Sequence, residues 1–151
     1  MRTLWESFCG GGMARLGLGS DWICQFANDR DTVKARAYIA NFGADHFNGA
    51  DVGLTLADLS PGRPDLVWAS PPCKDVSAAG PRIGRNGKRS AAVWPWWSLM
   101  RQLIDAGRGP RVIVIENVDT LPTSNKGADI AAISQAPPLR KRGKFRKFYM
   151  Q

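Results

Sequence analysis

The stretch Arg111-Val112-Ile113-Val114-Ile115-Glu116 decides the fold class of this chain. Its unbroken run of β-branched residues is typical of a strand covered on both faces, as in a parallel sheet. A second apolar run, Asp65 to Ala69, predicts another strand, and apolar positions with helical spacing extend from Val93 to Ile104, with Gly107 ending the helix. Strands that alternate with helices indicate a doubly wound, mostly parallel α/β sheet built from right-handed crossovers.

The same alternation begins at the N-terminus. The sequence predicts two strands there, each followed by a helix: Thr3 to Phe8, Met13 to Leu18, Trp22 to Ala27 and Asp31 to Asn41. Weaker patterns predict a strand near Asp51 to Leu56 and a last helix from about Gly127 through Ala131 to Ile133. Between them, Asp75 to Ser90 is rich in glycine and basic residues and predicts a long mobile loop.

Composition places the chain among ordinary soluble domains. It has 151 residues, of which 44% are hydrophobic and 23% charged. No apolar stretch approaches the roughly 20 residues of a membrane span, and the N-terminus has no secretory pattern, so we expect a cytoplasmic protein. Its cysteines, Cys9, Cys24 and Cys73, include no Cys-x-x-Cys pair, and the single histidine, His46, lies in a polar stretch. We therefore expect no metal site and a solvated His46.

The net charge of +8 is unevenly distributed. Six of the 21 Lys and Arg residues lie in residues 137–151, which contain no acid. Mixed bases and aromatics could grip nucleic acid, but a solvated or disordered tail is the simpler interpretation. We expect residues 1–136 to form one domain and residues 137–151 to be a basic tail outside it.

Cys73 is a candidate nucleophile because it directly follows a predicted buried strand. Pro71 and Pro72 restrict the turn that carries it, since each proline fixes its own φ and limits the preceding residue. A small buried hydrophobic role is the alternative for any free cysteine. The basic segment after Cys73 could lower the pKa of its thiol, bind phosphate, or simply face solvent.

The cluster Phe8-Cys9-Gly10-Gly11-Gly12 is a candidate cofactor loop. Glycine lacks a Cβ and permits positive φ, so backbone there can approach a ligand closely, although a plain turn would use the same residues. Asp29 follows Gly10 by 19 residues, where nucleotide-binding sheets place an acid that accepts hydrogen bonds from ribose. The segment departs from the dinucleotide pattern G-x-G-x-x-G because Arg15 stands where the third glycine belongs.

One sheet edge should bring these groups together. If the strands over residues 3–8, 65–69 and 111–116 are neighbours, then the glycine loop, Cys73 and Glu116-Asn117 emerge along the same edge. Glu116 closes an apolar strand, so partial desolvation could raise its pKa and let it act as an acid. Alternatively, it caps the next segment or is solvated.

Five segments in this order resemble the DNA cytosine-5 methyltransferases: Phe8-Cys9-Gly10-Gly11-Gly12, Asn28-Asp29, Asn41-Phe42-Gly43, Pro71-Pro72-Cys73 and Glu116-Asn117-Val118. The resemblance implies a Rossmann-like fold that binds S-adenosylmethionine. By position it assigns the cofactor site to Phe8, Gly10, Gly12, Asp29, Asp51 and Pro72. Asp29 stands where the family more often has Glu, which shortens the reach to the ribose.

The resemblance also assigns the chemistry. Cys73 would add to C6 of a cytosine flipped out of DNA, and Glu116 would engage N3 of that base. Residues of the closing loop that contacts DNA would be Ser77, Arg82, Arg85, Arg89 and Asn117. Such an enzyme would methylate DNA, for example within a restriction-modification system.

The resemblance stops at residue 136. A family member would continue with an arginine motif and a target-recognition domain, and neither follows here. We expect an incomplete fold: either a truncated methyltransferase or one half of an enzyme completed by a second chain. A remnant that binds S-adenosylmethionine or nucleic acid without chemistry is the alternative. A nicotinamide-dependent oxidoreductase would fit the glycine loop but neither Pro71-Pro72-Cys73 nor Glu116-Asn117-Val118.

Overall fold

A computed structural model describes residues 1–50, 56–72, 92–118, 123, 126–127 and 131. They form a parallel sheet of five strands, β1 (Arg2–Ser7), β2 (Trp22–Asn28), β3 (Phe47–Asn48), β4 (Leu66–Ala69) and β5 (Val112–Ile115). The strand order is β3-β2-β1-β4-β5. The chain thus moves outward from β1 in one direction, then returns and moves outward in the other, which confirms the predicted doubly wound sheet.

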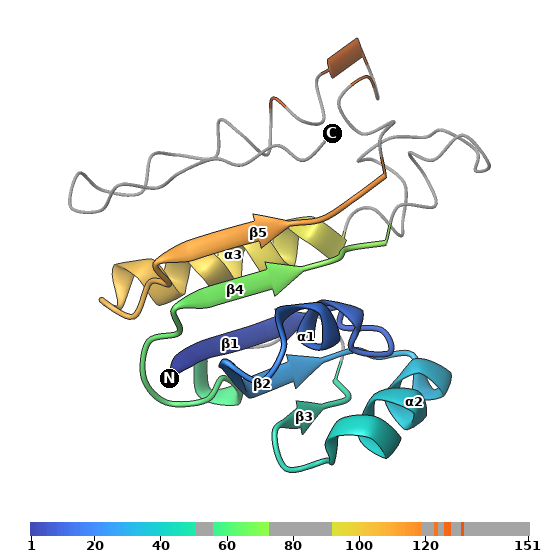
Figure 1. Cartoon of the computed structure of the whole chain (residues 1–151). Helices are drawn as coiled ribbons and strands as arrows, with labels where there is room; N and C mark the ends of the chain where they lie inside the picture. The colour runs from blue at the N-terminus through green and yellow to red at the C-terminus, as the bar shows by residue number, and fades with distance from the viewer. Residues whose placement is uncertain (51–55, 73–91, 119–122, 124–125, 128–130, 132–151) are drawn as a thin grey trace.

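Helices cover both faces of this sheet (Figure 1). α1 (Met13–Leu18) and α2 (Thr32–Phe42) lie on one face, and α3 (Val93–Asp105) lies on the other. A short 3-10 helix, η1 (Leu56–Asp58), precedes β4. The bounds of α1 match the prediction. Each end of α2 and α3 lies no more than one residue from its predicted position.

The core on the α3 face is large and apolar. Every third or fourth residue of α3 is buried, which is the helical period that the sequence predicted. Trp96 is 1% exposed and packs with Trp5 of β1 and Val67 of β4. The buried residues of α3 are Val93, Trp96, Leu99, Met100 and Leu103.

The core on the α1 and α2 face is smaller and more polar. α1 buries no residue fully, and α2 buries only Tyr38. The Tyr38 ring lies 5.1 Å from the Phe42 ring and 5.4 Å from the Phe47 ring, centroid to centroid. Cys24 of β2 is buried beside this aromatic group. This face therefore depends on a few contacts around one tyrosine.

The sequence did not predict the third strand of the described sheet. β3 is formed by Phe47–Asn48, and Leu56, the last residue of the predicted strand, begins η1. Two residues are too few for an alternating pattern to appear in the sequence. β3 is specified by tertiary contacts instead, since it pairs only with the end of β2, through Ala27↔Phe47 and Asn28↔Asn48. Residues 51–55 lie outside the described part of the chain.

β5 is less enclosed than its sequence suggests. All four of its residues are half-buried, whereas the β-branched run predicted full cover on both faces. Among the described strands β5 is the last of the sheet, so only β4 shields its backbone there. The predicted loop over residues 75–90 and most of the predicted last helix lie outside the described residues.

Within the described ranges, the structure has no helix that is long and apolar enough to cross a membrane. The same ranges hold no group of three or more His, Cys, Asp or Glu side chains that could bind a metal ion.

Candidate functional site

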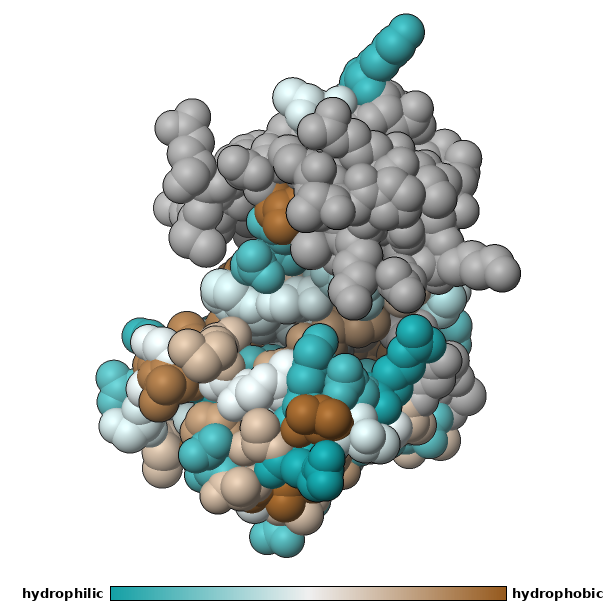
Figure 2. All heavy atoms as spheres, turned by 90° about the vertical axis from the view of Figure 1, so that its right-hand side faces the viewer, coloured by the Kyte–Doolittle hydropathy of each residue, from teal (hydrophilic) through white to brown (hydrophobic). Residues whose placement is uncertain are grey.

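The carboxyl ends of the strands meet at one edge, as predicted, with β1, β4 and β5 as neighbours. Figure 2 looks onto this edge, where hydrophilic residues lie among smaller hydrophobic areas. Backbone hydrogen bonds continue past the strand ends and join one loop to the next. They run from Cys9 N to Asn28 O (3.0 Å), from Ser70 N to Ser7 O (3.2 Å) and from Glu116 N to Ala69 O (2.8 Å).

The glycine loop leaves β1 in a strained conformation. Phe8 has φ 53°, in the left-handed region that non-glycine residues rarely adopt, and Gly10 and Gly12 have φ 56° and 84°. A hydrogen bond from Gly12 N to Cys9 O, 2.8 Å, closes the turn. Strain of this kind is held by surrounding structure and concentrates at functional sites. Phe8, a predicted cofactor contact, therefore lies at an unusual point of the backbone.

The three glycines serve different purposes. A Cβ on Gly10 or Gly11 would meet no atom within 4 Å, whereas a Cβ on Gly12 would lie 2.3 Å from Cε2 of Phe42. Gly12 is thus required so that the loop can pack against α2. Gly10 and Gly11 leave open space, which is the arrangement that close approach of a ligand needs.

Asp29 fixes the glycine loop from the neighbouring strand. The carboxylate is buried, and its Oδ2 accepts a hydrogen bond from Gly10 N at 2.9 Å. Its Oδ1 accepts another from Asp31 N, also at 2.9 Å, just before α2. A carboxylate oxygen can accept more than one hydrogen bond, so both oxygens keep capacity for a ligand. Asp29 was predicted as a ligand contact, and the structure adds a role in holding the loop.

The sequence analysis predicted no role for Asn28 beyond its place in the Asn28-Asp29 segment, yet its side chain makes two hydrogen bonds. It is 2% exposed, and Nδ2 donates to Asn48 O at 2.9 Å and to Ala50 O at 2.8 Å. Both carbonyls belong to the segment that leaves β3. An amide at the last position of a strand was the only sequence signal for this contact.

Glu6 is a buried carboxyl group that the sequence analysis missed. It lies in β1, is 1% exposed, and its Oε2 has no hydrogen-bond partner among the described residues. Burial raises the pKa of Glu6 to about 7, against the opposing effect of the Arg15 backbone N–H and guanidinium. An acid inside the apolar strand that feeds the glycine loop was the signal that could have revealed it.

The predicted nucleophile, Cys73, lies just beyond the described residues. β4 ends at Ala69, and the two prolines that follow are described, Pro71 as buried and Pro72 as half-buried. Asn117 Nδ2 donates a hydrogen bond to Pro71 O at 3.2 Å, and Asn117 Oδ1 accepts one from Val118 N at 3.0 Å. The segment before Cys73 is therefore tied directly to the segment after Glu116.

Glu116 is exposed, which agrees with the alternative that its carboxyl group is solvated rather than partly desolvated. The reason is its position one residue past β5, the last described strand, where a single neighbouring strand gives little cover. Its backbone is nonetheless fixed by the hydrogen bond to Ala69 O.

The other predicted DNA contacts, Ser77, Arg82, Arg85 and Arg89, lie outside the described residues, as does Asp51 of the predicted cofactor site. Their positions remain predictions from the sequence.

The two described cysteines, Cys9 and Cys24, are free and buried. Burial raises the pKa of both thiols, so neither is a thiolate nucleophile at neutral pH.

His46 is half-buried rather than solvated, contrary to expectation. Its Nε2 lies 2.6 Å from Nη1 of Arg15 and 3.2 Å from Oη of Tyr38, and burial lowers its pKa. A neutral imidazole that accepts a hydrogen bond from Arg15 links α1, α2 and the start of β3.

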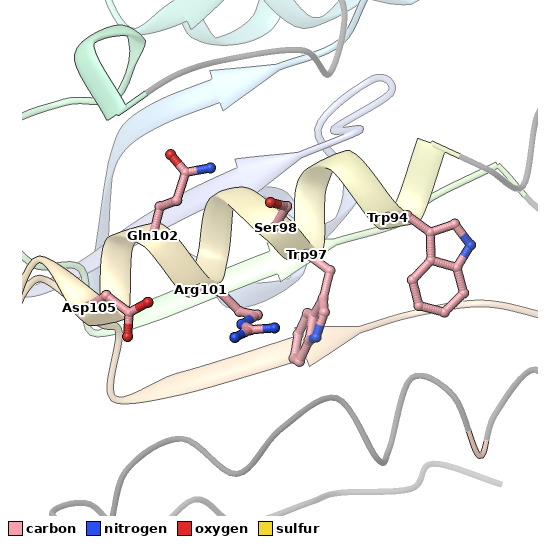
Figure 3. Close-up of a pocket in the computed structure, with 6 residues that line it drawn as sticks. All are labelled: Trp94, Trp97, Ser98, Arg101, Gln102 and Asp105. Atoms are coloured by element: carbon pink, nitrogen blue, oxygen red, sulfur yellow. The ribbon is translucent and has the colours of Figure 1, made fainter.

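A separate groove of about 370 Å³ runs along the outer side of α3. Figure 3 shows the two tryptophans and the charged side chains that line it. It contains none of the predicted site residues. Its lining residues are Trp94, Trp97, Ser98, Arg101, Gln102 and Asp105.

Comparison with known proteins gives a consistent set of relatives. The family model for C-5 cytosine-specific DNA methylase matches residues 3–136. The type II methyltransferase M.AquIA of Picosynechococcus sp. (strain ATCC 27264 / PCC 7002 / PR-6) is 31% identical over 97 residues, which are 63% of this chain and 37% of that protein.

Solved structures share the fold. The S. pombe Dnmt2 methyltransferase superposes with a TM-score of 0.67 at 22% identity, over 89% of this chain and 42% of its own. A DNA modification methyltransferase encoded within an E. coli prophage gives a TM-score of 0.61 at 18% identity, over 89% of this chain and 36% of its own. The chain thus spans less than half the length of the relatives it matches.

Proposed function

The chain belongs to the C-5 cytosine-specific DNA methylase family, and from this premise we propose that it transfers a methyl group from S-adenosylmethionine to C5 of cytosine in DNA through a covalent adduct with Cys73. Residues 1–136 would form the part that binds the cofactor and performs the chemistry. Residues 137–151 would be a basic tail outside it.

One observation carries the proposal: the segments that hold the nucleophile and the acid are joined. β4 and β5 pair in parallel with Ala69 opposite Ile115, so Pro71-Pro72, which directly precede Cys73 in the sequence, and Glu116-Asn117 leave the sheet side by side. The hydrogen bond from Asn117 to Pro71 O holds the two segments together beyond the strands. A single cytosine ring presented here could meet both groups, with its C6 toward the thiol and its N3 toward the acid.

The described residues fit S-adenosylmethionine. The open space over Gly10 and Gly11 allows the loop backbone to approach the ligand, and buried Asp29 offers carboxylate oxygens next to that loop for the ribose hydroxyls. Phe8 borders the same loop, and Asp51 and Pro72 complete the proposed set. When bound, the cofactor supplies a methyl group on a positively charged sulfur.

Cys73 and Glu116 would divide the chemistry. Addition of the Cys73 thiolate to C6 pushes electrons into the ring, and Glu116 stabilises the result by donating a proton or strong hydrogen bond to N3. C5 then carries enough electron density to take the methyl group, and the cofactor would leave as S-adenosylhomocysteine. A base, for which a water molecule would serve, removes the C5 proton. The C5–C6 double bond re-forms as the C6–S bond breaks, which returns the thiolate, and N3 returns its proton to Glu116. A cytosine whose N3 edge meets the exposed Glu116 would itself exclude water from that carboxyl group.

DNA is the proposed substrate. A base inside a duplex cannot present C6 to a thiol, so the cytosine must be flipped out. Ser77, Arg82, Arg85 and Arg89 would contact DNA from the segment after Cys73. Residues that read the target sequence would come from outside the matched region or from a second chain. The type II name of M.AquIA favours a role in restriction-modification, within the cytoplasm.

Trapping the adduct tests this proposal. The purified chain is incubated with labelled S-adenosylmethionine and DNA that contains 5-fluorocytosine, where fluorine replaces the proton that must leave C5. We expect a covalent complex that carries label and resists denaturation, and its loss in Cys73→Ser.

Two other outcomes separate the alternatives. Calorimetric binding of S-adenosylmethionine without an adduct would favour a cofactor-binding remnant or a half-enzyme that needs a second chain. Failure to bind the cofactor at all would overturn the proposal and the remnant alike. Glu116→Gln serves as a matched variant, because it should bind cofactor normally but form the adduct much more slowly.

A further inference from the structure

We propose that Arg15 is a positioning residue that seats the glycine loop, Phe8 to Gly12, against α2 and so sets the affinity of the chain for its cofactor. The inference rests on the proposed use of S-adenosylmethionine. Arg15 is the residue at which the sequence departs from the pattern G-x-G-x-x-G, and this role accounts for the departure.

The helix that continues the glycine loop has little packing of its own. α1 has six residues, and none of them is fully buried. Its apolar side chains Met13 and Leu16 are 73% and 64% exposed. Leu16 N donates a hydrogen bond to Gly12 O at 2.9 Å, which joins the helix to the last residue of the loop. Because so short a helix is marginal by itself, contacts from elsewhere must fix it and the loop.

Arg15 supplies those contacts from the middle of α1. Its Nη1 donates hydrogen bonds to Tyr38 Oη at 3.1 Å and to His46 Nε2 at 2.6 Å. Its guanidinium carbon lies 4.5 Å from the centre of the Phe42 ring, within the range of a cation–π interaction. Tyr38 is 0% exposed, so it is a fixed anchor. One side chain therefore connects α1 with α2 and with the residue that precedes β3.

The Phe42 ring also seats the end of the loop. A Cβ on Gly12 would lie 2.3 Å from Cε2 of Phe42, so the loop backbone and the Arg15 guanidinium contact the same ring. Asp29 holds the other part of the loop through Gly10 N. The loop thus has two anchors, and the open space over Gly10 keeps its shape only while both are in place.

The hydrogen bond to His46 requires a neutral imidazole. A protonated ring would place a second cation 2.6 Å from Nη1 of Arg15. Burial and the charge of Arg15 lower the pKa of His46 from 6.5, against the opposing effect of Asp45. The ring is therefore neutral at pH 7, and this contact is lost only as the pH falls below 6.5. The other titratable groups around it are Tyr38 of α2, Cys24 of β2 and Glu6 of β1.

Calorimetry with S-adenosylhomocysteine at pH 7.5 tests the proposal. Arg15→Met keeps the length of the side chain but removes its donors and charge. It should weaken binding about tenfold, the effect of one hydrogen bond from a charged group. Arg15→Lys keeps the charge and can donate to one acceptor, so we expect an intermediate loss. This second variant covers the case in which Arg15→Met does not fold.

Matched variants separate positioning from general damage. Arg36→Met makes the same change at an exposed site on α2 and should leave the affinity unchanged. Leu103→Ala, in the α3 core, should lower the free energy of unfolding without changing the affinity.

Hydrogen exchange without ligand reports on the loop itself. In Arg15→Met we expect faster exchange than in the wild type at Gly12 N–H, which donates to Cys9 O, and at Leu16 N–H. Exchange at Ala106 N–H, at the end of α3, should not change.

A pH profile isolates the contribution of His46. His46→Gln offers an acceptor that does not titrate, so its affinity should fall less than that of the wild type between pH 7.5 and pH 5.5. Glu6 titrates in both chains, so its contribution cancels in the comparison. Equal losses of affinity in the two chains would overturn the role of His46.

The outcomes distinguish this inference from the proposed function. Unchanged affinity in both Arg15 variants, or weaker binding without faster exchange at Gly12, would overturn the inference and leave the proposed function intact. If the wild-type chain does not bind S-adenosylhomocysteine, the proposed function fails. Exchange at Gly12 then decides alone whether Arg15 seats the loop.

Discussion

The two faces of the sheet differ in what they bury. On the α3 face, Trp5, Val67 and Trp96 form an extensive apolar core. On the α1 and α2 face, the smaller core contains two thiols, the hydroxyl of Tyr38 and the carboxyl group of Glu6. The first face supplies stability and the second holds groups that cost stability when buried.

Physical chemistry explains this division. Apolar burial contributes roughly 25 cal/mol per Å², so large side chains under α3 stabilise the domain efficiently. Burial of an ionisable group costs free energy unless it is paired or neutral. The ionisable groups that are buried at this free-energy cost lie on the α1 and α2 face, close to the glycine loop. Three changes test whether the two faces really differ in this way.

The largest expected effect is on the α3 face. Trp96→Ala would remove a side chain that is 1% exposed, leaving a cavity under α3. We expect the free energy of unfolding to fall by about 4 kcal/mol, measured by urea denaturation. Trp96→Phe, which also removes an indole N–H that has no partner among the described residues, should cost far less. Equal losses in both variants would argue against a packing role.

The next effect concerns Glu6 and depends on pH. The pKa of Glu6 is raised from 4.5 to about 7 in the folded chain, so the folded state holds a proton that the unfolded state releases. Stability from this group is fully present below pH 4.5 and is lost as pH rises toward 7, by about 3 kcal/mol in total.

Glu6→Gln should remove this part of the pH dependence and make the chain more stable than wild type at pH 8. Thermal melting between pH 4.5 and pH 8 measures it. Glu116→Gln is the matched control, because it makes the same substitution at an exposed carboxyl group. If the stability of Glu6→Gln depended on pH as steeply as that of the wild type, groups other than Glu6 would cause the pH dependence.

The smallest effect separates two adjacent glycines of the polar face. Gly12→Ala forces a Cβ against the Phe42 ring at φ 84° and should cost about 2 kcal/mol of stability. Gly11→Ala meets no atom within 4 Å and should leave stability nearly unchanged. It should instead weaken S-adenosylmethionine binding about tenfold, by filling the space above the loop. Urea denaturation of both variants measures the loss of stability, and calorimetry measures the loss of S-adenosylmethionine affinity.

Sequence patterns predicted most of the elements correctly. The helices with strong caps or strong periodicity were placed within a residue or so. α2 begins after the capping residue Asp31 and ends just before Gly43, and α3 shows a clear apolar face. The neighbouring order of β1, β4 and β5 was also predicted correctly, because doubly wound sheets follow few topologies.

The failures have a common cause. β3 was not predicted, and the importance of Glu6 and Asn28 was missed. Each depends on what lies across the sheet rather than on neighbours in the chain. Asn28, for instance, contacts carbonyls 20 and 22 residues away.

The sequence by itself determined the fold class, the family and the order of the chemistry-bearing segments, because apolar periodicity, glycine, proline and cysteine act locally. Only the tertiary structure decided which glycine leaves open space, which carboxyl group is buried, and how Asn117 ties the segment before Cys73 to the segment after Glu116. Burial and long-range hydrogen bonds exist only when distant strands pair, so no local pattern in the chain encodes them.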